Sequence, residues 1–182
     1  IVDEFHHAAA ATYRKILSHF RPKFLLGLTA TPHRSDQFDL LRLCDQNLVF
    51  NRDLFDGIES KLLSPFHYFG IADDESIVDY SEIPWRNGKF DPHLLEVKLA
   101  TELRARHVFH HWQQHKQACT LAFCLSKKHA DFMSSYFTKR GVRSASVHSD
   151  SEMRRNQALE LMRQGELDVV FSVDLFNEGV DL

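Results

Sequence analysis

Residues 168–173 read Asp-Val-Val-Phe-Ser-Val, a short and nearly continuous apolar run. Runs of this kind are typical of parallel strands that are covered on both faces, because such strands have no side that meets water. Further expected strands lie at 24–28, 120–125 and 142–147. Apolar residues at helical spacing fill the stretches 8–19, 94–116, 127–140 and 152–164. Helices that alternate with short apolar strands predict an α/β fold with parallel sheets flanked by helices.

This alternation is interrupted between residues 61 and 93. The stretch holds three prolines, the acidic cluster Asp73-Asp74-Glu75 and the turn-like pair Asn87-Gly88, and one more strand is expected at 66–71. Short helices and a strand without fixed bounds are expected at 35–60. The sequence therefore predicts a first lobe at 1–60, a crossover at 61–93 and a second lobe at 94–182.

The bulk composition narrows the class of protein. The chain has 182 residues, 43% of them hydrophobic, with no long apolar run and nothing like a signal peptide at its start. Three cysteines without CxxC spacing argue against a disulfide framework. These features predict a cytoplasmic protein that does not enter a membrane. The net charge of −3 provides no general basic face, so any contact with nucleic acid must be local.

Polar residues follow two of the expected strands at their carboxyl ends. Asp3 and Glu4 follow a strand end at residues 1–2, and Thr29-Ala30-Thr31-Pro32 follows the next strand. Neighbouring parallel strands would bring the threonine hydroxyls beside His6. On an extended chain the two carboxylates point to different sides, so Asp3 could hold a Mg²⁺ ion while Glu4 orients the attacking water.

The same stretches resemble helicase motifs. Asp3-Glu4-Phe5-His6 looks like motif II of the DExH class of superfamily 2 helicases, and residues 27–32 are similar to motif III. Residues 122–126 resemble motif IV, and residues 171–182 resemble motif V. The resemblance implies parts of two RecA-like lobes with parallel sheets flanked by helices, and hydrolysis of ATP with Mg²⁺ at the cleft between the lobes.

The resemblance also implies roles for residues around the nucleotide. His6, Thr29 and Thr31 would couple the nucleotide site to the nucleic-acid track, whereas Gly179 and Asp181 would lie near the ribose of ATP. The alternative for the threonines is that their hydroxyls only cap the turn.

A contact with nucleic acid is expected in the second lobe. Ser126 and Lys127 stand at a helix start, where free backbone amides and the helix dipole could receive a phosphate. His148 ends the next strand at an equivalent level and could face the same polymer. Simple capping of the helix, with the lysine in solvent, is the alternative.

Together these features predict a nucleic-acid-dependent ATPase motor, a helicase or translocase. Residues 82–85 and the form of motif V look like the branch that holds DNA repair helicases and the Res subunits of type III restriction enzymes, which favours DNA over RNA. Nuclease or specificity domains or subunits could lie outside this window.

Two motifs of such motors are missing from the 182 residues. There is no GxxxxGK[ST] loop, and no arginine-rich motif VI follows motif V. Both ends look cut, so we expect an internal fragment that runs from motif II to motif V. Because the loop and an arginine finger carry much of the chemistry, we predict that this polypeptide alone has no measurable ATPase activity.

Two other functions compete with the motor. One is a non-catalytic module that keeps the helicase fold for nucleic-acid binding or assembly. The other is a zinc site at His107, His111, His115 and Cys119, which recur every fourth residue and would share a helix face. One straight helix offers only two adjacent ligands to a tetrahedral ion, which favours a polar helix face instead.

Overall fold

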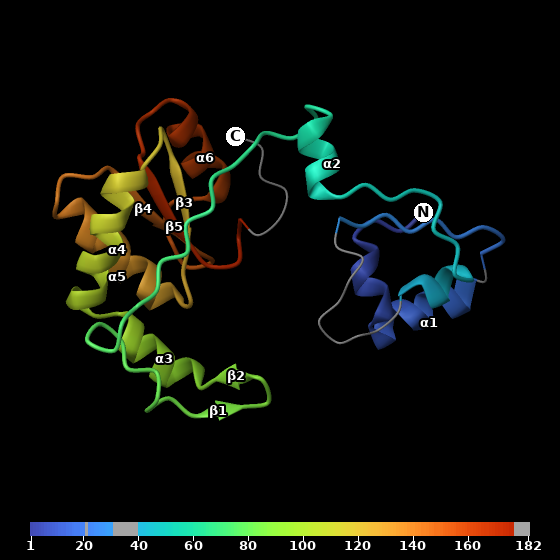
Figure 1. The fold of residues 1–182 in the computed structure, drawn as a ribbon, viewed down its shortest axis with the longest axis horizontal. Helices are drawn as coiled ribbons and strands as arrows, with labels where there is room; N and C mark the ends of the chain where they lie inside the picture. The colour runs from blue at the N-terminus through green and yellow to red at the C-terminus, as the bar shows by residue number, and fades with distance from the viewer. Residues whose placement is uncertain (21, 31–39, 177–182) are drawn as a thin grey trace. The chain divides into compact units, whose positions relative to one another are not determined.

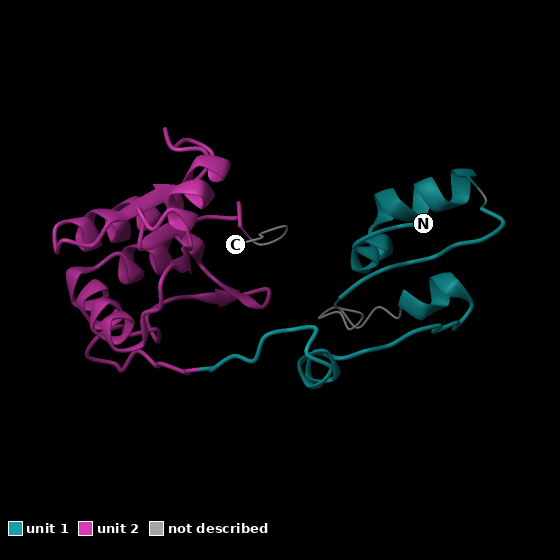
Figure 2. Ribbon diagram, turned by 90° about the horizontal axis from the view of Figure 1, so that it is seen from above, with its two compact units in different colours: residues 1–68 teal, residues 69–182 magenta. Residues whose placement is uncertain are grey.

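The computed structural model describes residues 1–20, 22–30 and 40–176. The chain forms two compact units, residues 1–68 and 69–182, which are coloured separately in Figure 2. Each unit has its own cluster of buried apolar side chains and is described by itself. The predicted site residues Thr31, Gly179 and Asp181 lie outside the described residues.

A three-stranded parallel sheet forms the centre of the second unit (Figure 1). Its strands are β3 (Thr120–Phe123), β4 (Ser144–Val147) and β5 (Val169–Ser172), and β5 lies between the other two. All four residues of β5 are buried, as expected for a strand with neighbours on both sides. The predicted strands at 120–125, 142–147 and 168–173, and the parallel α/β fold, are confirmed.

Helices cover both faces of this sheet (Figure 1). Buried residues of α4 (Glu102–His115) and α5 (Lys127–Thr138) cluster with Val169 and Phe171 of β5, whereas those of α6 (Arg155–Arg163) cluster with Val170. Because successive side chains of a strand point to opposite faces, α6 and the α4–α5 pair cover opposite sides of the sheet.

The helix that begins after β3 has the predicted ends. Ser126 caps α5, since its Oγ atom accepts the backbone N–H of His129 at 3.1 Å. Beyond the helix, Gly141 has a φ of 80°, a conformation that glycine adopts without a steric penalty.

The single long helix expected at 94–116 is wrong, because two helices occupy this stretch. They are α3 (Pro92–Leu99) and α4, with Ala100 and Thr101 between them. The side chain of Thr101 accepts the N–H of Arg104 at 3.3 Å and thereby caps the second helix. A threonine that bonds to the backbone in this way competes with continuation of the first helix.

A small hairpin precedes α3. Its strands β1 (Trp85–Arg86) and β2 (Lys89–Phe90) pair antiparallel, and the predicted turn at Asn87-Gly88 joins them with positive φ at both residues. The strand predicted at 66–71 is wrong, because residues 64–71 have no regular structure. No segment of the described chain forms a ladder with them, and a strand needs a partner for its backbone groups.

The first unit is mainly helical. It contains the 3₁₀ helices η1 (Phe5–Ala9) and η2 (Leu40–Cys44), and the α-helices α1 (Ala11–Phe20) and α2 (Leu54–Glu59). The helix expected at 8–19 and short helices within 35–60 are therefore confirmed, although no strand forms among residues 40–60. The buried cluster of this unit consists of Phe5, Ala8 and Leu40.

The two expected strands of the first unit pair at one position only. Val2 forms a parallel bridge with Gly27, so the predicted adjacency of the segments is confirmed. The predicted burial is wrong, because Ile1 and Phe24 are 85% and 76% exposed. Each segment has one neighbour in the described chain, and no second strand covers its other edge.

No helix of the described residues has the length and apolar character needed to cross a membrane.

Candidate functional site

The bridge at Gly27 brings together Glu4, His6 and Thr29, which we call the polar edge of the first unit. Val2 donates to the carbonyl of Leu26 at 2.8 Å and accepts from Leu28 at 2.9 Å, and Phe5 donates to the carbonyl of Leu28 at 2.8 Å. Gly27 is required for this approach, because a Cβ atom there would lie 2.5 Å from the Phe5 Cδ1 atom. The segments that carry the predicted motifs II and III are thereby held side by side.

His6 joins the two segments at this edge. Its Nδ1 atom lies 3.1 Å from the Thr29 Oγ1 atom and 3.2 Å from the Glu4 Oε2 atom. The contact with Thr29 is a hydrogen bond, and the contact with Glu4 is an ion pair when the ring is protonated. The predicted proximity of His6 to Thr29 is confirmed, and the contacts link the Glu4 carboxylate to the Thr29 hydroxyl through one imidazole ring.

Asp3 and Glu4 form a turn rather than the extended pair that was expected. Glu4 has a φ of 47° and a ψ of 49°, in the left-handed region, and its N–H donates to the Asp3 Oδ1 atom at 2.9 Å. The chain leaves the extended conformation here because the helix η1 begins at the next residue. This turn, rather than strand alternation, sets the relative position of the two carboxylates.

Asp3 is the carboxylate that would hold a magnesium ion of the kind used with nucleotides. Mg²⁺ commonly takes one or two protein carboxylates and completes its octahedron with water and phosphate oxygens. Asp3 is exposed, and the N–H of Glu4 fixes its carboxylate by one oxygen. An ion held there would take its other ligands from water and phosphate oxygens.

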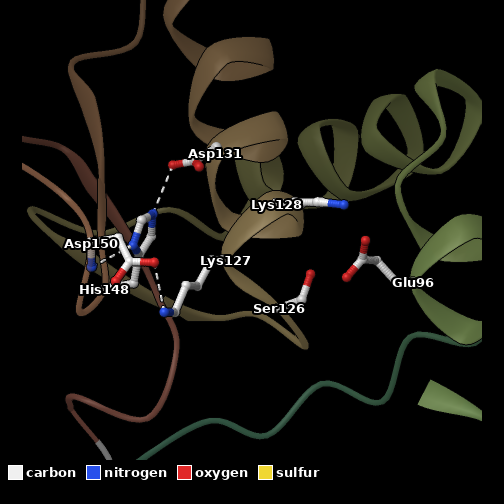
Figure 3. Close-up of a pocket in the computed structure, with 7 residues that line it drawn as sticks. All are labelled: Glu96, Ser126, Lys127, Lys128, Asp131, His148 and Asp150. Carbon is white, nitrogen blue, oxygen red and sulfur yellow. Dashed lines mark hydrogen bonds and ion pairs between the residues drawn. The ribbon is translucent and has the colours of Figure 1, made fainter. Parts of the chain in front are cut away.

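The strand ends of the second unit gather the three residues predicted to touch nucleic acid. The register aligns Phe123, Ser172 and Val147 at the carboxyl edge of the sheet. Beyond this edge lies an open hollow of about 540 Å³ (Figure 3). The residues that line it are Glu96, Ser126, Lys127, Lys128, Asp131, His148 and Asp150. Ser126, Lys127 and His148 are thus brought together.

His148 lies within a network of protein groups. Its side chain is 7% exposed, and the backbone N–H of Asp150 lies 3.3 Å from its Nδ1 atom. Because that N–H can only donate, Nδ1 accepts, and the neutral ring carries its proton on Nε2, which donates to Asp131 Oδ1 at 3.0 Å. Nε2 therefore holds the loop after β4 against α5, and Nδ1 holds the turn of that loop.

Asp131 is the acceptor at the centre of this network. Besides His148, the Ser146 hydroxyl donates to its Oδ1 atom at 2.5 Å. Burial raises the pKa of Asp131, but the hydrogen bonds from Ser146 and His148 outweigh it and leave the pKa below its ordinary value. The carboxylate is ionised at neutral pH and fixes the orientation of the ring.

Lys127 is held by an acidic neighbour. Its Nζ atom lies 2.7 Å from Asp150 Oδ2, and this hydrogen bond, with one from Ser149, lowers the pKa of Asp150. A phosphate that reached Lys127 would therefore compete with Asp150 for the ammonium group.

Three acidic residues of the hollow escaped the sequence prediction: Glu96, Asp131 and Asp150. A signal existed for Asp131, since it stands four residues after Lys127 and so shares its helix face. Asp150 lies two residues beyond His148 in the same loop. Glu96 belongs to α3, and no local pattern connects it to this edge.

Cys124 marks the end of β3 at the same edge. Its backbone N–H donates to the carbonyl of Ser172 at 2.8 Å. Burial raises the pKa of its thiol to about 12, a change that the Arg104 charge only partly opposes.

The proposed zinc ligands do not form a cluster. α4 ends at His115, so Cys119 lies beyond the helix and does not share its face, contrary to the expectation from spacing. His107 packs edge-on against His111, and His115 stacks on Phe69. Among residues 1–20, 22–30 and 40–176, no group of three or more His, Cys, Asp and Glu side chains is arranged to hold a metal ion.

Comparison with known proteins gives matches in both units. The family model described as "Type III restriction enzyme, res subunit" matches residues 1–34, and that described as "Helicase conserved C-terminal domain" matches residues 98–182. Among curated proteins, "Putative ATP-dependent helicase IRC3" of Saccharomyces cerevisiae is 26% identical over 193 aligned positions, covering 100% of this chain and 27% of that protein.

Two further relatives extend the range of organisms. "Putative mitochondrial ATP-dependent helicase irc3" of Schizosaccharomyces pombe is 25% identical, with 100% of this chain and 31% of that protein covered. "UvrABC system protein B" of Bifidobacterium longum is 27% identical, with 73% of this chain and 16% of that protein covered. The chain thus spans less than a third of the length of each of these three relatives.

Proposed function

Because the chain is related to superfamily 2 helicases in both of its units and resembles their repair and restriction branch, we propose that the whole protein is a nucleic-acid-dependent ATPase motor. It would use the free energy of ATP hydrolysis, with Mg²⁺, to unwind or move along its polymer. The relatives support an ATP-dependent helicase type of function. The residue roles, the choice of DNA and the cellular location are our own proposals.

One observation carries the proposal: the chain of contacts from Glu4 through His6 to Thr29. The imidazole lies within hydrogen-bond distance of both the carboxylate and the hydroxyl, at 3.2 Å and 3.1 Å. A motor must make hydrolysis depend on the state of its track, and a polar link between two segments can transmit such a change. This arrangement supports His6 and Thr29 as coupling residues, and we assign Thr31 the same role.

The hydrolytic step would divide between the two adjacent carboxylates. Bound Mg²⁺ would neutralise charge that develops on the phosphate oxygens of ATP. Asp3 would hold the ion, with its carboxylate oriented by the N–H of Glu4. Glu4 would orient the attacking water, and its Oε2 atom lies 3.2 Å from the Nδ1 atom of His6. We place Gly179 and Asp181 near the ribose.

In the second unit, Ser126 and Lys127 would contact the phosphates of the polymer. The N-terminal dipole of α5 supports this role, while the Ser126 hydroxyl also caps the helix by accepting from His129. His148 has both ring nitrogens engaged within the protein, so its contribution would be to hold the loop that carries Asp150 opposite Lys127. We retain residues 1–60 and 94–182 as parts of two RecA-like lobes joined by the crossover 61–93.

We propose DNA rather than RNA as the polymer. The match of residues 1–34 to a restriction-enzyme model supports this choice. We also propose that nuclease or specificity domains or subunits act together with this chain. We propose a cytoplasmic location in the cell of origin, although one relative is named as mitochondrial.

The full-length protein tests this function directly. ATPase activity would be measured alone and with single-stranded DNA, double-stranded DNA and RNA. We expect stimulation by DNA above that by RNA, and no turnover by the 182-residue polypeptide. A full-length protein without ATPase on any polymer would support the non-catalytic module instead.

A substitution at Thr29 tests the contact between His6 and Thr29. Thr29→Val keeps the shape of the side chain but removes the hydroxyl that lies beside His6, so DNA-stimulated turnover should fall about 3- to 10-fold, with unstimulated turnover changed little. Ser18→Ala removes an exposed hydroxyl bonded within α1 and serves as the matched control. Equal stimulation in Thr29→Val and in the control would contradict the assigned coupling.

A further inference from the structure

The hairpin of β1 and β2 contains a pair of like charges. Its register places Arg86 directly opposite Lys89, so the two side chains emerge on one face. Directly opposed residues have Cβ atoms about 4.5 to 5.5 Å apart, and like charges at that distance destabilise the pairing. Both residues are exposed, and among the described residues neither forms an ion pair.

On the opposite face of the hairpin, Phe90 attaches it to the unit. Trp85 pairs with Phe90 in the register, and their rings meet edge to face with centroids 4.6 Å apart. Phe90 also contacts Tyr80, with ring centroids at 5.9 Å. The Tyr80 hydroxyl donates to Asp73, which also accepts from Arg104 of α4 at 2.9 Å. Phe90 therefore anchors the hairpin to Tyr80, whereas Trp85 is 61% exposed and packs on Phe90. Because side chains alternate along each strand, the two cations lie on the other face of the hairpin.

The hairpin is also fixed at its base. The N–H of Asp91 donates to the carbonyl of Pro84 at 3.0 Å, and the Asp91 carboxylate caps α3 by accepting from Leu94. Ile83, directly before the hairpin, is 4% exposed. β2 therefore leads without a free segment into α3, beside which it lies in Figure 1.

We propose that Arg86 and Lys89 form a phosphate-binding face for the sugar–phosphate backbone of nucleic acid. This inference rests on the proposed function, and it adds a contact outside the helicase motifs. A local arrangement that lowers stability without a compensating internal contact is typical of functional surfaces. The guanidinium of Arg86 suits bidentate phosphate contact, and Lys89 adds a second charge that reaches a neighbouring phosphate of a strand. Contacts of this kind position a strand without reading its sequence.

The test uses the full-length protein and the salt dependence of DNA binding. Arg86→Ala/Lys89→Ala should lower the slope of log Kd against log salt by about 1.4 to 1.8, because two phosphate contacts are lost. By the same relation, affinity at 0.1 M salt should fall on the order of 20- to 60-fold. The control is Arg106→Ala/Lys139→Ala, which removes the same charge from exposed positions of α4 and the end of α5.

A second variant separates binding from folding. Lys89→Glu places opposite charges across the hairpin. The melting temperature of this variant protein should therefore be equal to or above that of the wild type, while its affinity for DNA falls. A structural role for Lys89 would instead lower the melting temperature. An unchanged salt slope in the alanine pair would overturn this proposal alone. A full-length protein that binds neither DNA nor RNA would overturn both this proposal and the proposed function.

Discussion

The two units use parallel pairing to different degrees. In the first, Val2 meets Gly27 in a single bridge, and the apolar side chain of Phe24, three residues before Gly27, is exposed. In the second, β5 has a parallel neighbour along each edge and helices on both faces, and all four of its residues are buried. Similar apolar runs thus have very different environments.

The difference shows that fixing the relative position of two segments requires fewer contacts than burying their apolar side chains. One bridge suffices to bring His6 to Thr29, because three backbone hydrogen bonds around it fix the relative height of the segments. Burial needs neighbours on every side, as Val170 has in β5. We therefore expect variants at the polar edge of the first unit to alter activity, and variants within β5 to alter stability.

The largest effect is expected at Glu4. In the full-length protein, Glu4→Gln removes the carboxylate that orients water, so turnover should fall about 10²- to 10⁴-fold. ATP binding should be largely retained, because Asp3 still holds the metal. The rate constant kcat and the Kd for a non-hydrolysable ATP analogue would be measured together.

The control for Glu4 is Glu59→Gln, an exposed carboxylate at the end of α2. It should leave both constants unchanged. Turnover by Glu4→Gln at the level of this control would refute the assigned role, and a matching loss of melting temperature would indicate a structural one.

A smaller effect, on stability, separates the two apolar runs. Val170→Ala truncates a side chain of 0% exposure at the centre of the sheet and should destabilise the second unit by about 2 to 3 kcal/mol. Phe24→Ala truncates a larger but exposed side chain and should change stability by about 0.5 kcal/mol or less. Urea unfolding of the 182-residue chain measures both. Equal losses would contradict the contrast between the units.

The smallest effect is expected at the amino end of the sheet. Arg143 bonds to both carboxylate oxygens of Asp168, at 2.5 Å and 3.0 Å, and holds the pKa of that carboxyl below its usual value. A pKa that is lower in the folded state stabilises above the unfolded value of about 3.9 and loses this contribution as pH falls through the folded value.

Asp168→Asn should therefore melt slightly below the wild type at pH 7, and the difference should vanish at the most acid pH. Because the pair is partly exposed, the shift should be at most a few degrees and should shrink in high salt. Glu75→Gln, at an exposed position, is the control. A difference that grows on acidification would show that the sign is wrong.

The sequence predicted elements whose signals are local. The Asn87-Gly88 turn, the Ser126 cap and the β5 strand all depend on residues within a few positions of one another. The approach of His6 to Thr29 was predicted because parallel pairing of successive strands is a general rule.

The wrong secondary-structure predictions arose where the same local sequence pattern is compatible with two different structures. Residues 66–71 have the composition of a strand but no partner in the described chain, and residues 94–116 have helical spacing that the cap at Thr101 divides. The acidic residues around Lys127 were missed because Glu96 and Asp150 approach it from α3 and the loop after β4. Only tertiary structure brings those segments together.

The half-buried thiol of Cys124 has a practical consequence for chemical labelling. Thiolates, not thiols, react with alkylating reagents, and a pKa of about 12 leaves roughly one molecule in 10⁵ ionised there at pH 7. Maleimide dyes and mild oxidants will therefore leave this end of β3 almost unmodified. Once Cys44 and Cys119 are replaced by serine, a fluorophore on a cysteine introduced at the exposed turn between β1 and β2 can report on that hairpin without interference from Cys124.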